Sequence, residues 1–453
     1  MKQVHFIAVG GSAMHNIAIA LHTKGYKVTG SDDEVFEPSR SRLAKHGLLP
    51  AEMGWNPERI HAGLDSVIVG MHARPDNPEL LKAQELGLTI YSYPEFIYSQ
   101  SKNKQRIVVA GSHGKTTTTS MIMHVLAYHK RKFDYLVGAQ LEGFDTMCKL
   151  TEDAPIIVIE GDEYFSSPID RTPKFLRYQH HIGLVSGIAW DHINVFPTEE
   201  IYVRQFDHFA DATPKGGILI YNDKDPLGSV ICKKERPDVL QVPFQTHPAQ
   251  IIDGVTHLVT SAGKVPVPFF GQHNLLNVSG AQHLCAKIGI SEEMFYEAIQ
   301  SFKGAANRLE LVKQNSITAL YKDFAHAPSK VRATTKALKE QYPQRKLFVC
   351  LELHTFSSLN KKFLKEYEGA LNMADTAIVY FNPEVIAHKQ LEPITAEEVK
   401  TAFKKADLQV YNDSKSLAEM LENYDWSGTN LALMSSGNFD GISANELAEK
   451  IVK

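Results

Sequence analysis

A glycine-bracketed turn between an apolar run and a helical segment constrains this chain more than any other feature. Residues 107–110 form the pattern of a buried strand, and a helical pattern begins at Lys115. Backbone N–H groups in such a turn, a helix start and a lysine together bind phosphate oxygens, and a nearby hydroxyl can bind Mg²⁺. The loop is shorter than a strict P-loop, because Val109 stands five positions before Gly114. We predict a polyphosphate site, with a glycine turn that happens to precede a lysine as the alternative. Its residues are Gly111, Ser112, His113, Gly114, Lys115, Thr116 and Thr117.

The bulk composition indicates an ordinary soluble α/β protein of two to four domains. The chain has 453 residues, of which 43% are hydrophobic and 22% charged. A net charge of −4 gives no electrostatic reason to expect a nucleic-acid partner. The four cysteines lie far apart and suggest neither disulfides nor a zinc site. The start lacks a signal peptide, and no apolar run is long enough for a membrane span, so we expect a cytoplasmic protein that does not bind membranes. The oligomeric state stays open.

The first block, residues 1–104, begins like a nucleotide-binding βαβ unit. A strand at 4–9 leads into Gly10-Gly11-Ser12, a helix at 13–24 follows, and a second strand at 27–32 ends in Asp32. The full GxGxxG fingerprint is absent, so binding of a nucleotide diphosphate and a purely structural turn both stay open. Further strands are expected at 66–70 and 88–91, with a helix at 77–86, and the polar stretch 99–105 is expected to be a linker.

The second block, residues 105–303, places acidic and imidazole side chains at further strand ends. The run 156–159 ends in Glu160-Gly161-Asp162-Glu163, and the run 182–188 precedes Trp190-Asp191-His192. In a parallel sheet these ends meet the phosphate loop at one edge, where Glu160 and His192 can be ligands of Mg²⁺. A surface acidic turn and a structural histidine are the alternatives. Another strand is expected at 217–223. The helix that opens near 271 carries Asn274 and Asn277, which either cap it or face a base.

The third block, residues 304–453, alternates strands and helices and predicts a doubly wound sheet. Its expected strands are 316–322, 346–351, 376–380, 408–411 and 430–434. Its expected helices are 329–341, 360–373, 395–406 and 414–423.

Taken together, the motifs resemble those of the Mur ligase family, the ATP-dependent amide-forming enzymes of bacterial cell-wall synthesis. The resemblance covers essentially the whole chain and rests on six segments in order. These are 111–117 (short phosphate loop), 160–163 (Glu-Ala-Asp-Glu segment), Asp191-His192, 271–277 (adenine segment), 307–310 (hinge arginine) and 323–326 (Asp-Tyr/Phe-x-His turn).

The resemblance implies a three-domain architecture: a Rossmann-like UDP-sugar domain (1–104), a central P-loop-type ATPase domain (105–303) and a Rossmann-like C-terminal domain (304–453) that binds the incoming amine. It implies ATP and Mg²⁺ as cofactors, with Lys115 on the β- and γ-phosphates. Thr116, Glu160 and His192 would hold metal, and Asn274, with His273 or Asn277, would read the adenine. Arg308 would meet the phosphates when the third block closes, and Asp323 and His326 would touch the nucleotide. Substrate residues would be Gly11, Ser12, Asp32, His72 and Arg171.

Within the family, the turns at 10–12 and 30–32 are similar to the branch whose donor is UDP-N-acetylmuramate. That branch contains an L-alanine ligase and a murein peptide ligase, which adds recycled L-Ala-γ-D-Glu-meso-diaminopimelate. Segments 163–164, 170–175, 191–196 and 435–442 resemble the peptide ligase, so we expect the tripeptide as acceptor in peptidoglycan recycling. Leu351-Glu352-Leu353-His354 departs from the usual Glu-Pro-Arg, so the residues that recognise the peptide's carboxylates are not identified. No lysine lies between His192 and Lys215, so we expect no carbamylated lysine.

The sequence disfavours two other classes of protein. A catalytically silent UDP-sugar sensor would not need Lys115, Thr116, Glu160 and His192 intact. A dehydrogenase is disfavoured by the incomplete glycine fingerprint and by the phosphate loop.

Overall fold

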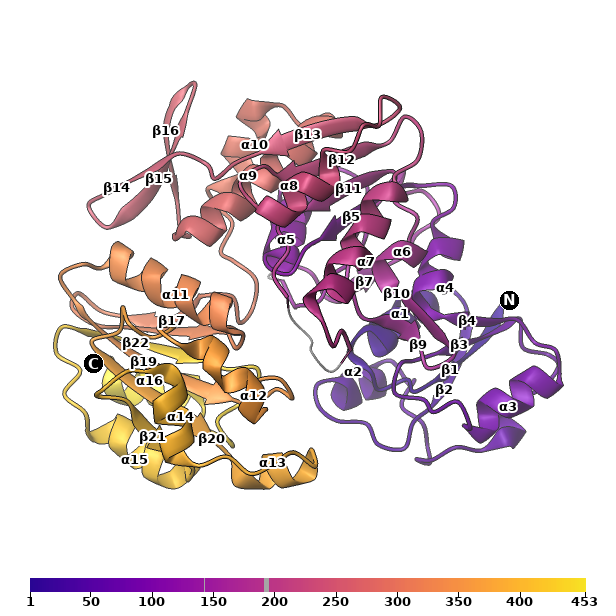
Figure 1. Cartoon of the computed structure of the whole chain (residues 1–453). Helices are drawn as coiled ribbons and strands as arrows, with labels where there is room; N and C mark the ends of the chain where they lie inside the picture. Colours follow the sequence, from indigo (N-terminus) through magenta and orange to yellow (C-terminus); the bar gives the residue numbers. More distant parts are fainter. Residues whose placement is uncertain (142, 191–194) are drawn as a thin grey trace. The chain divides into compact units, whose positions relative to one another are not determined.

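The computed structural model describes residues 1–141, 143–190 and 195–453 (Figure 1). The described chain divides into two compact units. The first contains residues 1–189, 199–245 and 279–299, and the second contains the described residues of 190–198 together with 246–278 and 300–453.

The first unit begins with a four-stranded parallel sheet of order β2-β1-β3-β4. Its strands are β1 (Gln3–Ile7), β2 (Lys27–Ser31), β3 (Ser66–Val69) and β4 (Ile90–Ser92). Its helices are α1 (Ser12–Thr23), α2 (Ser39–Lys45), α3 (Pro78–Glu85) and α4 (Tyr93–Gln100). The predicted βαβ unit is confirmed, because β1 and β2 pair in parallel with α1 between them in sequence.

A seven-stranded sheet of order β13-β12-β11-β5-β8-β6-β7 completes this unit. Its strands are β5 (Gln105–Ala110), β6 (Asp134–Leu136), β7 (Cys148–Lys149), β8 (Ile156–Glu160), β11 (Ile182–Val185), β12 (Ile218–Asn222) and β13 (Leu240–Phe244). The central strands are continuous apolar runs because both faces of a parallel sheet are covered. The helices are α5 (Lys115–Tyr128), α6 (Lys174–Arg177), α7 (Glu199–Asp211), α8 (Pro226–Cys232) and α10 (Glu292–Ile299), and β9 (Phe165–Ser167) and β10 (Asp170–Pro173) form a separate hairpin.

The polar stretch 99–105, expected to be a linker, connects α4 to β5, but it is not exposed throughout. Helix α4 continues to Gln100, β5 begins at Gln105, and Lys104 between them is buried. The Lys104 ammonium forms an ion pair with Asp134 at 2.7 Å and donates to two backbone carbonyls. A buried lysine is tolerated when its charge is paired and its donors are used, and here that pairing fixes the junction.

The second unit is built on a six-stranded sheet of order β17-β18-β22-β19-β20-β21, parallel except for the edge strand β17. The strands are β17 (Glu310–Gln314), β18 (Ala319–Asp323), β19 (Lys346–Leu353), β20 (Thr376–Phe381), β21 (Gln409–Tyr411) and β22 (Thr429–Met434). Alternate residues of β19 enter two separate cores, Val349 on one face and Cys350 on the other. Such two-sided covering is the doubly wound arrangement that the alternation predicts.

Helices cover both faces of this sheet. Residues of α11 (Pro328–Gln341), α12 (Lys361–Leu364), α13 (Pro383–His388) and α14 (Ala396–Phe403) enter one core, and residues of α15 (Ser414–Asn423) and α16 (Ala444–Ile451) enter the other. The expected helix 360–373 is wrong in extent, because it ends in the 3₁₀ turn η2 (Lys365–Tyr367). β17, α13 and α16 were not expected.

Helix α9 (Gln272–Lys287) and an antiparallel sheet complete the described elements of the block 226–303. The antiparallel strands are β14 (Ala249–Ile252), β15 (Val255–Thr260) and β16 (Gly263–Val267). Gln341 of α11 donates to the Gly254 carbonyl at 2.7 Å, which joins this small sheet to the C-terminal sheet's covering helix.

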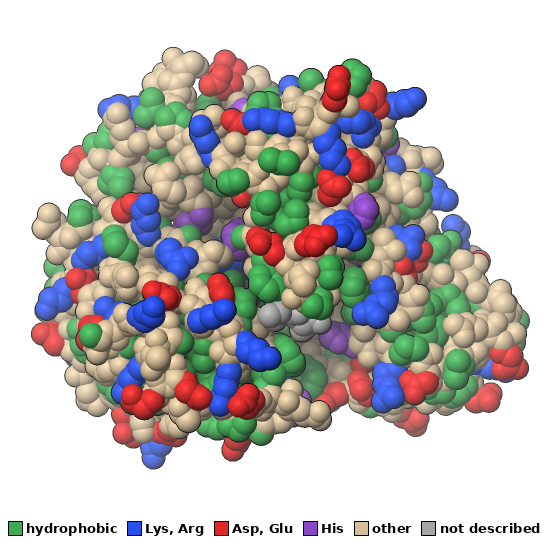
Figure 2. All heavy atoms as spheres, in the orientation of Figure 1, with side chains coloured by type: hydrophobic (Ala, Val, Ile, Leu, Met, Phe, Trp, Pro, Cys, Tyr) green, Lys and Arg blue, Asp and Glu red, His purple; other side chains and the backbone are tan. Residues whose placement is uncertain are grey.

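On the face shown in Figure 2, basic and acidic side chains are interspersed. Among the helices of the described residues, none has the length and apolar character required to cross a bilayer.

Candidate functional site

The three strand ends that the sequence brings together are neighbours in the seven-stranded sheet. β5 lies between β11 and β8, and all three run in parallel. In register, Ala110 pairs with Val185 and Val109 with Glu160, so the phosphate loop and Glu160 leave the same edge. The prediction of a shared edge is confirmed for Lys115 and Glu160. His192 lies outside the described residues, as does Asp191.

The turn after β5 requires glycine at two positions. Gly111 has φ of 132°, and a Cβ there would lie 2.1 Å from the Ser186 hydroxyl oxygen. Gly114 has φ of 76° and precedes the first residue of α5. Side chains other than glycine rarely adopt these conformations, so the turn can approach a ligand with bare backbone.

The Lys115 ammonium is held inside this turn. It donates to the Gly111 carbonyl at 2.7 Å and to the Glu163 carboxylate at 2.7 Å. Burial lowers the pKa of Lys115, but Glu163 and neighbouring carboxylates outweigh burial and hold this pKa above its usual value. The lysine is therefore a cation at neutral pH, with a counter-ion already in place.

Glu163 connects the lysine to a buried network that the sequence did not reveal. Its side chain is fully buried and accepts from the Tyr202 hydroxyl at 3.0 Å. The Tyr202 hydroxyl also lies 2.8 Å from the Ser112 hydroxyl. Tyr202 lies on α7, ninety positions from Ser112, and no local motif marks it. The network fixes the lysine and the turn relative to each other.

Glu160 and Thr116 form a preset pair of oxygen ligands. The Thr116 hydroxyl donates to the Glu160 carboxylate at 2.7 Å, and the Gly138 N–H donates to its other oxygen at 2.7 Å. Within the described part of the chain, no cluster of three or more His, Cys, Asp or Glu side chains could hold a metal by itself. Mg²⁺ commonly takes one or two protein oxygens and completes its shell with phosphate and water, so this pair fits it.

A cavity of about 330 Å³ in the first unit is lined by the start of α1 and by the first residue of α5. Gly11, Ser12 and His72 line it from the four-stranded sheet, and Lys115 and Glu160 line it from the seven-stranded sheet. The structure thus brings five predicted residues to one space. Among the lining residues that were not predicted as site residues are Tyr93, Asp162, Lys174 and Tyr178.

Asp32 lies behind the first glycine turn and does not line the cavity. Its carboxylate accepts from the Gly10 N–H at 2.7 Å and from the Asp33 N–H at 3.0 Å. Burial raises the pKa of Asp32 to about 6, although the Gly10 hydrogen bond opposes the rise. In the structure this aspartate holds the turn that leads into α1.

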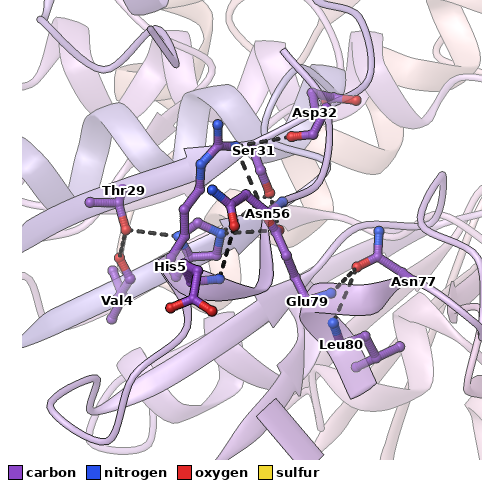
Figure 3. Close-up of polar contacts among 12 residues, drawn as sticks. Val4, His5, Thr29, Ser31, Asp32, Asn56, Asn77, Glu79 and Leu80 are labelled. Atoms are coloured by element: carbon purple, nitrogen blue, oxygen red, sulfur yellow. Dashed lines mark hydrogen bonds and ion pairs between the residues drawn. The ribbon is translucent and has the colours of Figure 1, made fainter. Parts of the chain in front are cut away.

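A buried polar cluster holds the strand end that carries Asp32 (Figure 3). Glu79 of α3 accepts from the Ser31 hydroxyl and from the Asn56 N–H at 2.8 Å, and lies 3.3 Å from the His5 ring nitrogen Nε2. Burial would raise the pKa of Glu79, but hydrogen bonds from His5 and Ser31 outweigh it and lower this pKa. Glu79 is therefore an ionised, fully buried carboxylate that connects β1, β2 and α3.

Five predicted nucleotide residues lie in the second unit. The Asn274 amide donates to the Phe270 carbonyl at 3.0 Å, and the Asn277 amide lies 3.4 Å from the Asn274 side-chain oxygen. Asp323 accepts from the Leu309 N–H at 3.2 Å. The Arg308 guanidinium lies 4.6 Å from the Phe324 ring centre, between Asn307 and Leu309, which both have positive φ. The His326 ring nitrogen Nδ1 lies 2.8 Å from the Phe324 carbonyl.

Arg171 is exposed and does not line the cavity. Its guanidinium lies 5.1 Å from the centre of the Phe165 ring in the hairpin β9–β10. Its role in substrate binding stays a prediction.

Comparison with known proteins agrees with this geometry. Three family models match in order: "Mur ligase family, catalytic domain" over residues 3–105, "Mur ligase middle domain" over 109–285 and "Mur ligase, glutamate ligase domain" over 307–437. A UDP-N-acetylmuramate–L-alanine ligase of Lactobacillus acidophilus is 30% identical, over 88% of this chain and 89% of the relative. The chain belongs to the Mur ligase family. A second such ligase, from Caldicellulosiruptor bescii, is 29% identical over the full length of both chains.

Solved structures show the same fold. A murein peptide ligase from Psychrobacter arcticus has a TM-score of 0.68 at 22% identity, with all of both chains covered. A UDP-N-acetylmuramate–alanine ligase from Thermotoga maritima has a TM-score of 0.74 at 18% identity, with 99% of both chains covered. The chain therefore has the three-domain α/β architecture of the Mur ligases, and it is an ATP-dependent amide-bond-forming ligase of peptidoglycan synthesis. The limits 104 and 303 between domains stay a prediction.

Proposed function

We propose that this ligase joins the carboxylate of UDP-N-acetylmuramate to the amine of L-Ala-γ-D-Glu-meso-diaminopimelate, with ATP converted to ADP and phosphate. The observation that supports it is the cavity in which the first glycine turn faces Lys115 and Glu160. The glycine turn before α1 offers backbone N–H groups at a helix N-terminus, which suit the diphosphate of a UDP-sugar. The glycine turn before α5 adds the Lys115 ammonium, which suits a triphosphate. One space therefore suits both a UDP-sugar and the phosphate that activates it.

The proposed chemistry needs no protein nucleophile. The donor carboxylate attacks the γ-phosphorus, ADP leaves, and an acyl phosphate forms. The acceptor amine then attacks the acyl carbon, loses a proton, and phosphate leaves from the tetrahedral intermediate. Positioning and neutralisation of charge provide most of the catalysis in phosphoryl transfer, and both are what this site supplies.

The predicted residues of the phosphate turn and of the first glycine turn have proposed tasks. Lys115 would contact the β- and γ-phosphates and spread their charge, because its ammonium already lies inside the turn. Thr116 and Glu160 would hold Mg²⁺, which when bound offsets repulsion between the carboxylate and the γ-phosphate. His192 is proposed for a second Mg²⁺ on the basis of the family resemblance. Gly11, Ser12 and His72 would hold the donor's diphosphate.

The residues of the second unit are assigned from the resemblance. Asn274 and Asn277 are proposed for the adenine, and Arg308, Asp323 and His326 for the rest of the nucleotide. Because the substrates are UDP-sugars and ATP, we propose the cytoplasm as the place of the reaction.

The tripeptide acceptor is supported by sequence segments rather than by the cavity. Residues 170–175 and 435–442 resemble the peptide ligase. In the second segment, the Phe439 N–H donates a hydrogen bond to the buried Glu352 carboxylate at 2.8 Å. L-Alanine is the second candidate acceptor, because the curated relatives at 28–30% identity are UDP-N-acetylmuramate–L-alanine ligases.

An acceptor assay tests the proposal. Purified enzyme receives UDP-N-acetylmuramate, ATP and Mg²⁺, with tripeptide, L-alanine or no acceptor, and ADP release is measured. We expect the tripeptide to give the largest kcat/KM. A larger value for L-alanine would replace the tripeptide by the second candidate, and no acceptor-dependent release with either would refute the donor as well.

A further inference from the structure

A second ammonium lines the cavity and has no task in the proposed reaction. Lys174, the first residue of α6, faces the same space as Gly11, Ser12, Lys115 and Glu160. Its side chain is 12% exposed, so most of it is withdrawn from bulk water. Lysine is seldom buried to this degree unless its charge is paired or used.

The counter-ion of Lys174 leaves most of its hydrogen-bonding capacity unused. The ammonium forms an ion pair with the Asp162 carboxylate at 2.6 Å. In residues 1–141, 143–190 and 195–453 no other hydrogen-bond acceptor of this ammonium is found. An ammonium has three N–H donors, so two remain for a ligand in the cavity.

The ammonium is also held in position. Asp162 accepts from the Tyr164 N–H at 3.1 Å through its other oxygen, which fixes the carboxylate behind the lysine. The faces of Tyr93 and Tyr164 each lie with their ring centres 5.5 Å from the ammonium. Burial lowers the pKa of Lys174, but Asp162 outweighs burial and raises it, so the group is charged at neutral pH. The cation–π contacts and the ion pair orient the ammonium but leave two of its three N–H donors available for a ligand.

We propose that Lys174 is a substrate-contacting residue that binds the carboxylate of the UDP-N-acetylmuramate donor, and that Asp162 is its positioning residue. This inference rests on the proposed function. The donor has two anionic groups, a diphosphate and a carboxylate, and the cavity lining includes both a glycine turn and the Lys174 ammonium. The glycine turn at the start of α1 suits the diphosphate, whereas Lys174 and Asp162 lie with Glu160 on the seven-stranded-sheet side, where the carboxylate must meet the γ-phosphate.

The two anionic groups can be distinguished with two ligands. UDP-N-acetylglucosamine has the same diphosphate as the donor but lacks the lactyl carboxylate. Binding of each ligand is measured by calorimetry without ATP, for the wild type and for Lys174→Met. A charge-assisted hydrogen bond corresponds to a loss of about 10- to 100-fold in affinity when it is removed. We expect that loss for UDP-N-acetylmuramate and less than about a twofold change for UDP-N-acetylglucosamine.

Two further variants separate contact from structure. Lys104 is a second buried lysine in an ion pair of the first unit, with a 6% exposed side chain and no place in the cavity. Lys104→Met should lower the melting temperature and leave the affinity for both ligands unchanged. Lys174→Arg, which keeps a cation, should recover part of the lost affinity.

Several outcomes would overturn the inference. They are equal losses for both ligands in Lys174→Met, no loss for either, or equal effects of the Met and Arg variants. If the wild type itself does not bind UDP-N-acetylmuramate, the proposed function fails instead, so the two failures are distinguishable.

Discussion

The first unit contains two strand–glycine turn–helix motifs that share a topology and differ in charge. The turn between β1 and α1 has no lysine, and the nearest acid, Asp32, is buried behind it and holds the Gly10 N–H. The turn between β5 and α5 has Lys115, with Glu163 as counter-ion and Glu160 on the adjacent strand. Both present a helix N-terminus to the same cavity.

The shared topology provides an anion site in both turns, and the side chains decide which anion each site suits. A bare turn offers backbone N–H groups and a helix dipole, which suffice for a diphosphate. A turn with a lysine, a hydroxyl and a carboxylate suits a triphosphate with Mg²⁺.

Removal of the Lys115 cation from the turn between β5 and α5 should have the largest effect on the rate of the reaction. Lys115→Ala should lower ADP release that depends on both substrates by about two to three orders of magnitude, because a preorganised charge on the phosphates is lost. The variant also leaves Glu163 buried without its cation, which is destabilising. Lys115→Ala/Glu163→Gln should therefore regain thermal stability without regaining rate. A near-native rate in either variant would refute the assignment of this turn.

The two turns should respond differently when a glycine is replaced by alanine. Gly111 has φ of 132°, and Gly111→Ala places a Cβ 2.1 Å from the Ser186 hydroxyl oxygen. We therefore expect the variant to lose about 2 kcal/mol of unfolding free energy and to bind ATP more weakly. Gly11 has φ of −57°, and a Cβ there would meet its nearest atom, of Met14, at 3.4 Å. Gly11→Ala should keep its stability and raise the KM for the UDP-sugar. Urea unfolding and steady-state kinetics check both, and equal destabilisation would contradict the contrast.

The buried cluster beneath the first turn should contribute stability that depends on pH. Glu79→Gln should lower the unfolding free energy by about 2 kcal/mol at pH 7, because hydrogen bonds to a charged group are lost. The pKa of Glu79 is lowered in the folded state, so its contribution is present above the usual value of 4.5 and is lost as pH falls below it. The difference between wild type and variant should shrink in acid. A difference independent of pH would show that Glu79 is not ionised.

Asp32 should show the opposite dependence on pH. Burial raises its pKa from 3.8 to about 6, so the folded state binds more protons between these values and stability falls as pH rises through them. Asp32→Asn should remove this cost and stabilise the protein by about 1 to 2 kcal/mol at pH 7.5, with little effect at pH 4. Asparagine can still accept from the Gly10 N–H. Thermal unfolding across this range checks the sign, and destabilisation at pH 7.5 would contradict it.

The sequence predicted the parts of the fold that depend on local pattern. The βαβ start, the phosphate turn and the convergence of β5, β8 and β11 follow from apolar runs and glycine positions. The sequence did not predict that Lys104, within the linker 99–105, is buried, because its ion-pair partner Asp134 lies thirty positions later. The helix expected at 360–373 has suitable residues, but it ends after one turn and continues as a 3₁₀ turn.

The backbone of the phosphate turn followed from the sequence alone, since glycine at 111 and 114 and the start of a helix at 115 depend on conformational preferences of adjacent residues. Only the tertiary structure decided which charges face each other. Lys115 is paired with Glu163 and Lys174 with Asp162, and Tyr202 arrives from another helix to complete the network. Side-chain pairing is decided by packing across elements, which a linear pattern does not encode.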